Sequence, residues 1–144
     1  MQSQHYKILI GVIGEDIHET GNKIIAQILE HDGFEVINLG IQASPSSFVK
    51  HSKQENVTAI IVSSLYGRAK EDCKHLMKLF QEDSLFHPPI YLGGYLASPN
   101  ENWKEVEDFY LNLGFTRVYK PGTPIEKTIA DLREDLMIPY EALH

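Results

Sequence analysis

The chain has 144 residues, of which 42% are hydrophobic and 23% are charged. Its 13 basic and 20 acidic residues give a formal net charge of −7, which disfavours nucleic acid or an anionic membrane surface as a partner. A single Cys excludes an internal disulfide, and no apolar run reaches the roughly 20 residues that a membrane helix needs. We therefore expect a cytoplasmic protein with one domain over residues 1–144, a core over about 7–136 and a short C-terminal tail over 137–144.

Five apolar segments rich in β-branched residues alternate along the chain with five segments of helical periodicity. The predicted strands cover residues 7–13, 34–39, 57–63, 90–92 and 115–119. None of them alternates strictly between apolar and polar residues, as the run Ala59-Ile60-Ile61-Val62 illustrates. This pattern indicates strands that are covered on both faces, as in a parallel sheet.

A helix is predicted after each strand. The first carries an apolar stripe of Ile24, Ile25, Ile28 and Leu29 and ends at Gly33, and the second begins at Ser44-Pro45. The third and fourth carry apolar residues at spacing i, i+3, i+4 and i+7, namely Cys73, Leu76, Met77 and Phe80, then Val106, Phe109, Tyr110 and Leu113. The fifth begins with a capping box in which Thr123 is the N-cap, Pro124 follows at the first helical position and Glu126 completes the box.

Five strand–helix units joined by right-handed crossovers predict an α/β fold of the flavodoxin-like (Rossmann-like) type. The expected core is a doubly wound five-stranded parallel sheet with strand order 2-1-3-4-5. In such folds the ligand lies beyond the C-terminal ends of the strands, near the switch point between the first and third strands. The residues that follow each strand are therefore the candidates for a binding site.

Asp16 and His18 follow the first predicted strand. In an extended segment, residues i and i+2 project to the same side, so the Asp16 carboxylate can reach the His18 ring. A carboxylate that accepts a proton from one imidazole nitrogen fixes the tautomer and leaves the other nitrogen free to bind a metal. The alternative is a solvated acidic loop with a surface histidine.

The ends of the third, fourth and fifth strands carry mostly small residues. These segments are Ser63-Ser64-Leu65-Tyr66-Gly67, Gly93-Gly94 and Tyr119-Lys120-Pro121-Gly122-Thr123. Each has an ordinary structural explanation, as a strand end, a tight turn or a helix cap. Together they predict a pocket in which a bulky, largely flat ligand can approach the backbone closely.

Two other ligand classes known for this architecture fit the residues less well. A flavin mononucleotide site needs phosphate-binding donors after the first strand, where this chain has Glu15, Asp16 and Glu19. A phosphorylated receiver domain needs an aspartate near the end of the third strand, where this chain has Ser63 and Ser64.

Three elements in order, Asp16-x-His18-x-x-Gly21, Ser63-Ser64-Leu65 and Gly93-Gly94, resemble the cobalamin-binding signature of base-off, histidine-on corrinoid proteins. From Gly11 to about Leu136 the chain resembles the small, cobalamin-binding subunit of glutamate mutase (methylaspartate mutase). The resemblance extends to Gly21-Asn22-Lys23-Ile24, Asn102-Trp103 and Pro121-Gly122-Thr123.

This resemblance implies that His18 is the lower axial ligand of the cobalt, with Asp16 hydrogen-bonded behind it. It also implies that Ser63 hydrogen-bonds the displaced base of the cofactor. The implied cobalamin-binding residues are Asp16, Ile17, His18, Gly21, Ser63, Leu65, Tyr66, Gly67, Gly93, Gly94, Tyr119, Pro121, Gly122 and Thr123. None of them is expected to be catalytic.

The family's reaction is the radical interconversion of (S)-glutamate and (2S,3S)-3-methylaspartate with adenosylcobalamin as cofactor. The resemblance implies a large, barrel-type catalytic subunit as partner, and this chain is then inactive alone. Its only arginines, Arg68, Arg117 and Arg133, offer little to bind a dicarboxylate. The sequence departs from the family pattern at Tyr95, at Pro99-Asn100 and at Lys120.

Two alternative functions use the same motif. One is a corrinoid carrier for methyl transfer, although such carriers usually have a helical domain before the fold, and here the first strand begins by Lys7. The other is a cobalamin-binding module without catalysis, or one that serves another isomerase.

Overall fold

The computed structural model describes residues 6–14, 20–64, 67–82 and 86–139. The strands are β1 (Lys7–Val12), β2 (Glu35–Asn38), β3 (Ala59–Ser64), β4 (Ile90–Gly94) and β5 (Arg117–Val118). The helices are α1 (Thr20–His31), α2 (Pro45–Gln54), α3 (Ala69–Gln81), α4 (Trp103–Leu113) and α5 (Ile125–Leu136). The strands form a five-stranded sheet in the order β2-β1-β3-β4-β5, and all neighbouring pairs are parallel. The predicted doubly wound α/β fold and its strand order are confirmed.

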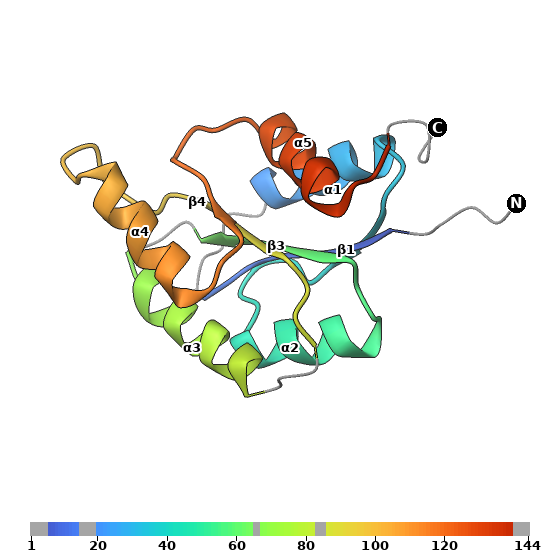
Figure 1. Cartoon of the computed structure of the whole chain (residues 1–144), viewed down its shortest axis with the longest axis horizontal. Coiled ribbons are helices and arrows are strands. Elements are labelled where there is room, and N and C mark those ends of the chain that lie inside the picture. Colours follow the sequence, from blue (N-terminus) through green and yellow to red (C-terminus); the bar gives the residue numbers. More distant parts are fainter. Residues whose placement is uncertain (1–5, 15–19, 65–66, 83–85, 140–144) are drawn as a thin grey trace, which may run out of the picture.

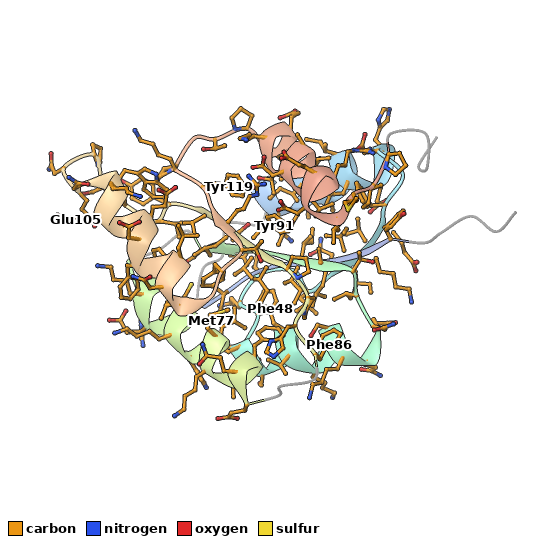
Figure 2. All side chains as sticks on the ribbon, viewed as in Figure 1. Phe48, Met77, Phe86, Tyr91, Glu105 and Tyr119 are labelled. Carbon is orange, nitrogen blue, oxygen red and sulfur yellow. The ribbon has the colours of Figure 1, made fainter. Side chains whose placement is uncertain are left out.

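Helices cover both faces of the sheet, with α1 and α5 on one face and α2, α3 and α4 on the other (Figure 1). In β1, Ile8 belongs to the apolar cluster under α1 and α5, whereas Leu9 belongs to the cluster under α2, α3 and α4. Figure 2 shows the same division, with Phe48 and Met77 on one side of the sheet and Tyr91 on the other. Because both faces are buried, the strands need no polar face.

The strand ends differ from the predicted ones where they approach the site. β4 continues to Gly94, two residues beyond the predicted end, and there it pairs with Ser64 of β3. β5 contains only Arg117–Val118 instead of residues 115–119. Phe115 and Tyr119 are nevertheless buried, in the two different apolar clusters, so the apolar pattern there reflects core packing rather than strand pairing.

The helix ends agree with the predictions except at α5. Ser44 caps α2 by accepting a hydrogen bond from the Ser47 amide at 3.1 Å, and Gly33 follows α1 with a φ of 100°. The capping box predicted for α5 is wrong, because Pro124 is the N-cap and the Thr123 hydroxyl donates instead to the Lys120 carbonyl at 2.6 Å. Thr123 thus stabilises the turn before α5. Within the described part of the chain, no helix is long and apolar enough to cross a membrane.

Candidate functional site

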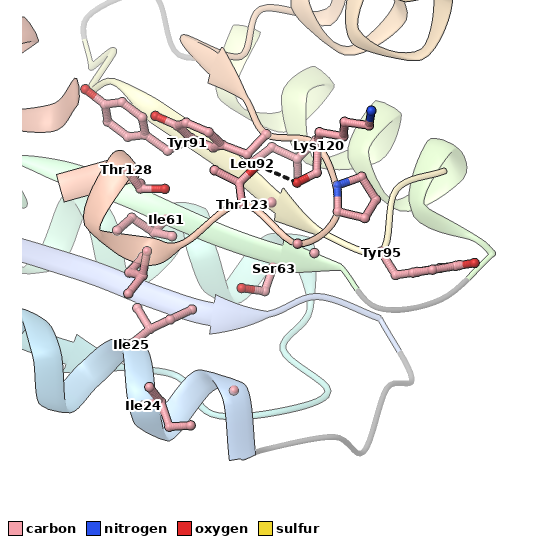
Figure 3. Close-up of a pocket in the computed structure, with 17 residues that line it drawn as sticks. Ile24, Ile25, Ile61, Ser63, Tyr91, Leu92, Tyr95, Lys120, Thr123 and Thr128 are labelled. Carbon is pink, nitrogen blue, oxygen red and sulfur yellow. Dashed lines mark hydrogen bonds between the residues drawn. The ribbon is translucent and has the colours of Figure 1, made fainter. Parts of the chain in front are cut away.

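A cleft of about 450 Å³ lies at the C-terminal end of the sheet, between the ends of β3 and β4, the first turns of α1 and the segment that leads into α5 (Figure 3). Apolar side chains from α1 and the strands, among them Ile24, Ile25 and Ile61, form one part of its lining. The turn that precedes α5 contributes Lys120 and Pro121. A volume of this size is typical of small-molecule sites.

Most of the predicted site residues within the described segments line this cleft. They are Gly21, Ser63, Gly93, Gly94, Tyr119, Pro121, Gly122 and Thr123. Gly67 lies instead at a neighbouring cavity on the other side of β4. Asp16, Ile17, His18, Leu65 and Tyr66 lie outside the described residues. The structure therefore brings together segments that are up to about 100 positions apart in the sequence, as the predicted topology requires.

Several lining residues were missed by the sequence analysis, among them Ile25, Ile61, Tyr91 and Thr128. Ile24 was expected to face the core with the rest of its stripe, but its side chain is 49% exposed and lines the cleft. The sequence does carry a signal for this exposure. Ile24 and Ile25 are adjacent, and adjacent residues of a helix point in different directions, so they cannot both face the core equally.

The glycines of the cleft have two different roles. A Cβ atom added at Gly21, Gly93 or Gly122 would meet nothing within 4 Å, so these positions keep space open, although the φ of +89° at Gly122 also favours glycine. Gly94 has a φ of +105°, and its Cβ would lie 2.2 Å from the Ser64 carbonyl oxygen. The backbone conformation therefore requires glycine at Gly94, whereas at Gly93 the absence of a side chain only leaves space in the cleft.

Ser63 supplies a hydroxyl at the end of β3. The residue is 9% exposed and lines the cleft, and within the described segments its side chain has no hydrogen-bond partner. A hydroxyl in such a place can bind a polar ligand atom at little cost, because it gives up no protein partner.

Two tyrosines anchor α5 over the cleft. The Tyr91 hydroxyl donates to Asp135 Oδ2 at 2.7 Å, and the Tyr119 hydroxyl donates to Asp131 Oδ2 at 2.8 Å. Arg117 donates to both oxygens of Asp135, at 2.9 and 2.7 Å. These bonds join β4 and the β5 segment to α5, and they fix the position of the helix whose first residues line the cleft.

The charges of this network follow from its contacts. Hydrogen bonds from Arg117 hold the pKa of Asp135 below its ordinary value, against the opposing effect of burial. Burial raises the pKa values of Tyr91 and Tyr119, and their hydrogen bonds to the aspartates raise them further. Both phenols are therefore neutral donors at neutral pH.

The described part of the chain contains no group of three or more His, Cys, Asp or Glu side chains placed to hold a metal ion. His18, the predicted axial ligand, lies outside that part.

Residues 6–112 match the family model of the B12 binding domain. The glutamate mutase sigma subunit of Fusobacterium nucleatum is 46% identical over 132 residues, which cover 92% of this chain and 97% of that protein. The sigma subunit of Clostridium cochlearium is 40% identical over 131 residues, covering 91% and 96%. The chain belongs to the glutamate mutase sigma subunit family. This confirms the resemblance inferred from the motifs.

Solved structures agree on the fold of this sigma-family chain. A cobalamin-binding protein from Desulfitobacterium hafniense superposes with a TM-score of 0.71 at 20% identity, covering 90% of this chain and 60% of that one. The methanol:cobalamin methyltransferase complex MtaBC of Methanosarcina barkeri gives 0.69 at 19% identity, covering 96% and 51%. At these identities the likeness concerns the architecture alone.

The first prediction concerns the anchor of α5. Asp135→Asn removes the charge that Arg117 pairs with, so we expect the free energy of unfolding at pH 7 to fall by about 1–3 kcal/mol. Because the folded-state pKa of Asp135 is lowered, its contribution is complete above the ordinary aspartate pKa of about 3.9 and is lost as the pH falls from there through the folded-state value. Urea unfolding between pH 3 and 7 measures this.

Asp108→Asn is the matched control, since Asp108 forms an exposed i, i+4 pair with Lys104 on α4. We expect a smaller loss of stability there than at Asp135. Equal losses in the two variants, or an acid dependence that Asp135→Asn leaves unchanged, would contradict the anchoring role.

The second prediction compares adjacent glycines. Gly94→Ala should lower the free energy of unfolding by about 2–4 kcal/mol, because the positive φ and the Ser64 carbonyl both oppose a side chain. Gly93→Ala should change it by no more than about 0.5 kcal/mol, because its Cβ meets open space. Denaturant titration of both variants measures the two free energies of unfolding. Similar losses in Gly94→Ala and Gly93→Ala would contradict the different roles given to the two glycines.

Proposed function

We propose that this chain is the cobalamin-binding subunit of an adenosylcobalamin-dependent glutamate mutase and acts with a large, barrel-type catalytic subunit. The observation that carries the proposal is the cleft at the strand ends of a chain that belongs to the sigma subunit family. Sigma-subunit relatives match nearly the full length of the chain, which supports the proposal that this chain has the role of a sigma subunit.

The cleft suits the nucleotide tail of cobalamin. Its open glycine positions admit a bulky group against the backbone, and its isoleucines offer apolar contact to a flat base. The Ser63 hydroxyl has no partner in the described segments, so it is free to bond a ring nitrogen of the base. These features are properties of the chain itself, and they support the fit of the cofactor.

The proposed roles of the residues combine this fit with what the resemblance to the cobalamin-binding signature implies. His18 would hold the cobalt and Asp16 would orient the His18 ring, which is how a carboxylate behind a metal-bound histidine acts in general. Gly21, Gly93 and Gly122 keep the cleft open, and Tyr119 forms part of its wall. Leu65, Tyr66 and Gly67 are proposed to contact the corrin side of the cofactor, and Ile17, Gly94, Pro121 and Thr123 complete the proposed set.

When bound, adenosylcobalamin supplies the cobalt–carbon bond whose homolysis starts the radical rearrangement. The chain's contribution is to bind and orient the cofactor. The neutral Tyr91 and Tyr119, held by Asp135 and Asp131, keep the wall of the cleft fixed while the cofactor is bound.

The arginines support substrate binding by the partner. Arg117 is bonded to Asp135, and Arg133 forms an ion pair with Asp32. Arg68 is exposed at the start of α3. A dicarboxylate substrate needs a cationic group for each of its two carboxylates, and two of the three arginines are already paired, so we place its binding site in the catalytic subunit.

Reconstitution tests the proposal. The purified chain is mixed with the catalytic partner of the Fusobacterium nucleatum sigma subunit, adenosylcobalamin and (S)-glutamate, and 3-methylaspartate is measured. We expect product only when both proteins and adenosylcobalamin are present, with no product when methylcobalamin replaces it. A chain that binds cobalamin but forms no active complex, and that instead passes the methyl group of methylcobalamin to an acceptor thiol, would favour the methyl-transfer alternative.

A further inference from the structure

Two of the four exposed large hydrophobic side chains in the described part of the chain line the cleft. Ile24, on α1, is 49% exposed, and Tyr95, directly after β4, is 52% exposed. A single exposed apolar side chain is ordinary, but two at one cleft indicate a surface that a ligand covers. Tyr95 is also a position at which the sequence departs from the family pattern, so the family resemblance assigns it no role.

The backbone around Tyr95 is held on both sides of the residue. The Tyr95 amide donates to the Ser64 carbonyl at 2.8 Å, and the amide of the buried Leu96 donates to the Gly94 carbonyl at 3.1 Å. The Tyr95 ring itself extends beyond the end of β4, away from Ser63 (Figure 3). Tyr95 therefore presents an aromatic ring from a fixed backbone, which lowers the entropic cost of using this ring in binding.

Tyr95 stands between two cavities at the C-terminal end of the sheet. One is the cleft of about 450 Å³, and the other is a cavity of about 490 Å³ toward α3 and α4. Tyr95 lines both of them. The second cavity is also lined by Gly67, where an added Cβ would meet nothing within 4 Å. The surface around Tyr95 is therefore open to a group that is too wide for either cavity alone.

The proposed cofactor carries such a group next to the part that fills the cleft. The corrin is a wide, nearly flat macrocycle that is joined covalently to the nucleotide tail. When the tail lies in the cleft, this link holds the corrin at the mouth, where the Tyr95 ring is exposed. A tyrosine suits this place, because its ring contacts an apolar ligand surface while its hydroxyl stays in water.

We propose that the ring of Tyr95 packs against the corrin of cobalamin, which makes Tyr95 a further cofactor-binding residue of this chain. The inference rests on the proposed function, because the tail in the cleft is what brings the corrin to Tyr95. Ile24 belongs instead to the isoleucines that contact the tail inside the cleft. The two exposed side chains thus bind two different parts of one cofactor.

The first measurement compares the cobalamin affinity of four full-length proteins by visible absorption. Tyr95→Ala removes the ring and should weaken binding by roughly 5- to 30-fold, since the burial of aromatic surface is lost. Tyr95→Phe keeps the ring and should bind within about 2-fold of wild type. Leu111→Ala removes a side chain that is 38% exposed on α4 and lies outside both cavities, so it should bind as wild type does.

Nuclear Overhauser contacts identify the part of the cofactor that Tyr95 touches. They are recorded on the wild-type chain with diamagnetic adenosylcobalamin, and the signals of the Tyr95 ring are identified by their absence in Tyr95→Phe. We expect contacts from this ring to methyl protons of the corrin. Tyr6 is the internal control, since it precedes β1 at the opposite end of the sheet and should show none. A purely structural role of Tyr95 would not produce these contacts.

The outcomes separate this proposal from the proposed function. Cobalamin that binds with Overhauser contacts from Tyr95 to the base alone, or to no part of the cofactor, overturns the corrin contact only. Tyr95→Ala that binds cobalamin as wild type does overturns it too, and weaker association of that variant with the catalytic partner would assign the ring to the partner. The Overhauser contacts are measured on wild-type protein, so they decide even where Tyr95→Ala folds poorly. A wild-type chain that binds no cobalamin, alone or with the partner, overturns both proposals.

Discussion

The hydrogen-bonded contact between α5 and the sheet determines the shape of the cleft. One polar bond joins α1 to the sheet, from Asn22 Nδ2 to Asn38 Oδ1 of β2 at 2.6 Å, whereas α5 is joined to the sheet through both Asp131 and Asp135. Directional bonds from Tyr91, Tyr119 and Arg117 fix this helix in register. Because the first residues of α5 line the cleft, the width of the cleft depends on this polar network, whose two tyrosines also line the cleft.

The sheet explains why the two cavities differ. Helices bury both of its faces, and the two cavities lie at its C-terminal end, one on either side of β4. The side under α1 and α5 offers small residues, isoleucines and Ser63, which suit a flat group that enters deeply. The side toward α3 and α4 is lined instead by Tyr110, whose hydroxyl is buried without a partner, and by the exposed residues Lys70 and Glu101.

The sequence predicted the features that local patterns encode. Apolar runs and helical spacing predict the five units, and the topology rule predicts that Gly21, Ser63, Gly93 and Gly122 lie together, as the structure shows. The α5 network escaped prediction because the Tyr91–Asp135 bond joins residues 44 positions apart. Tyr110 was correctly expected in the core, but an apolar spacing carries no information about whether a buried hydroxyl finds a partner.

Identifying the protein residue that binds the cobalt is the most direct test of the account. The chain, labelled with nitrogen-15 histidine, is titrated with cobalamin by visible absorption, and electron paramagnetic resonance is recorded on the cobalt(II) form. The account predicts coupling of cobalt to a labelled histidine nitrogen that disappears in His18→Gly, with Asp16→Asn keeping the coupling but binding about 10- to 100-fold more weakly. Tight binding without histidine coupling, or coupling that survives in His18→Gly, would contradict it.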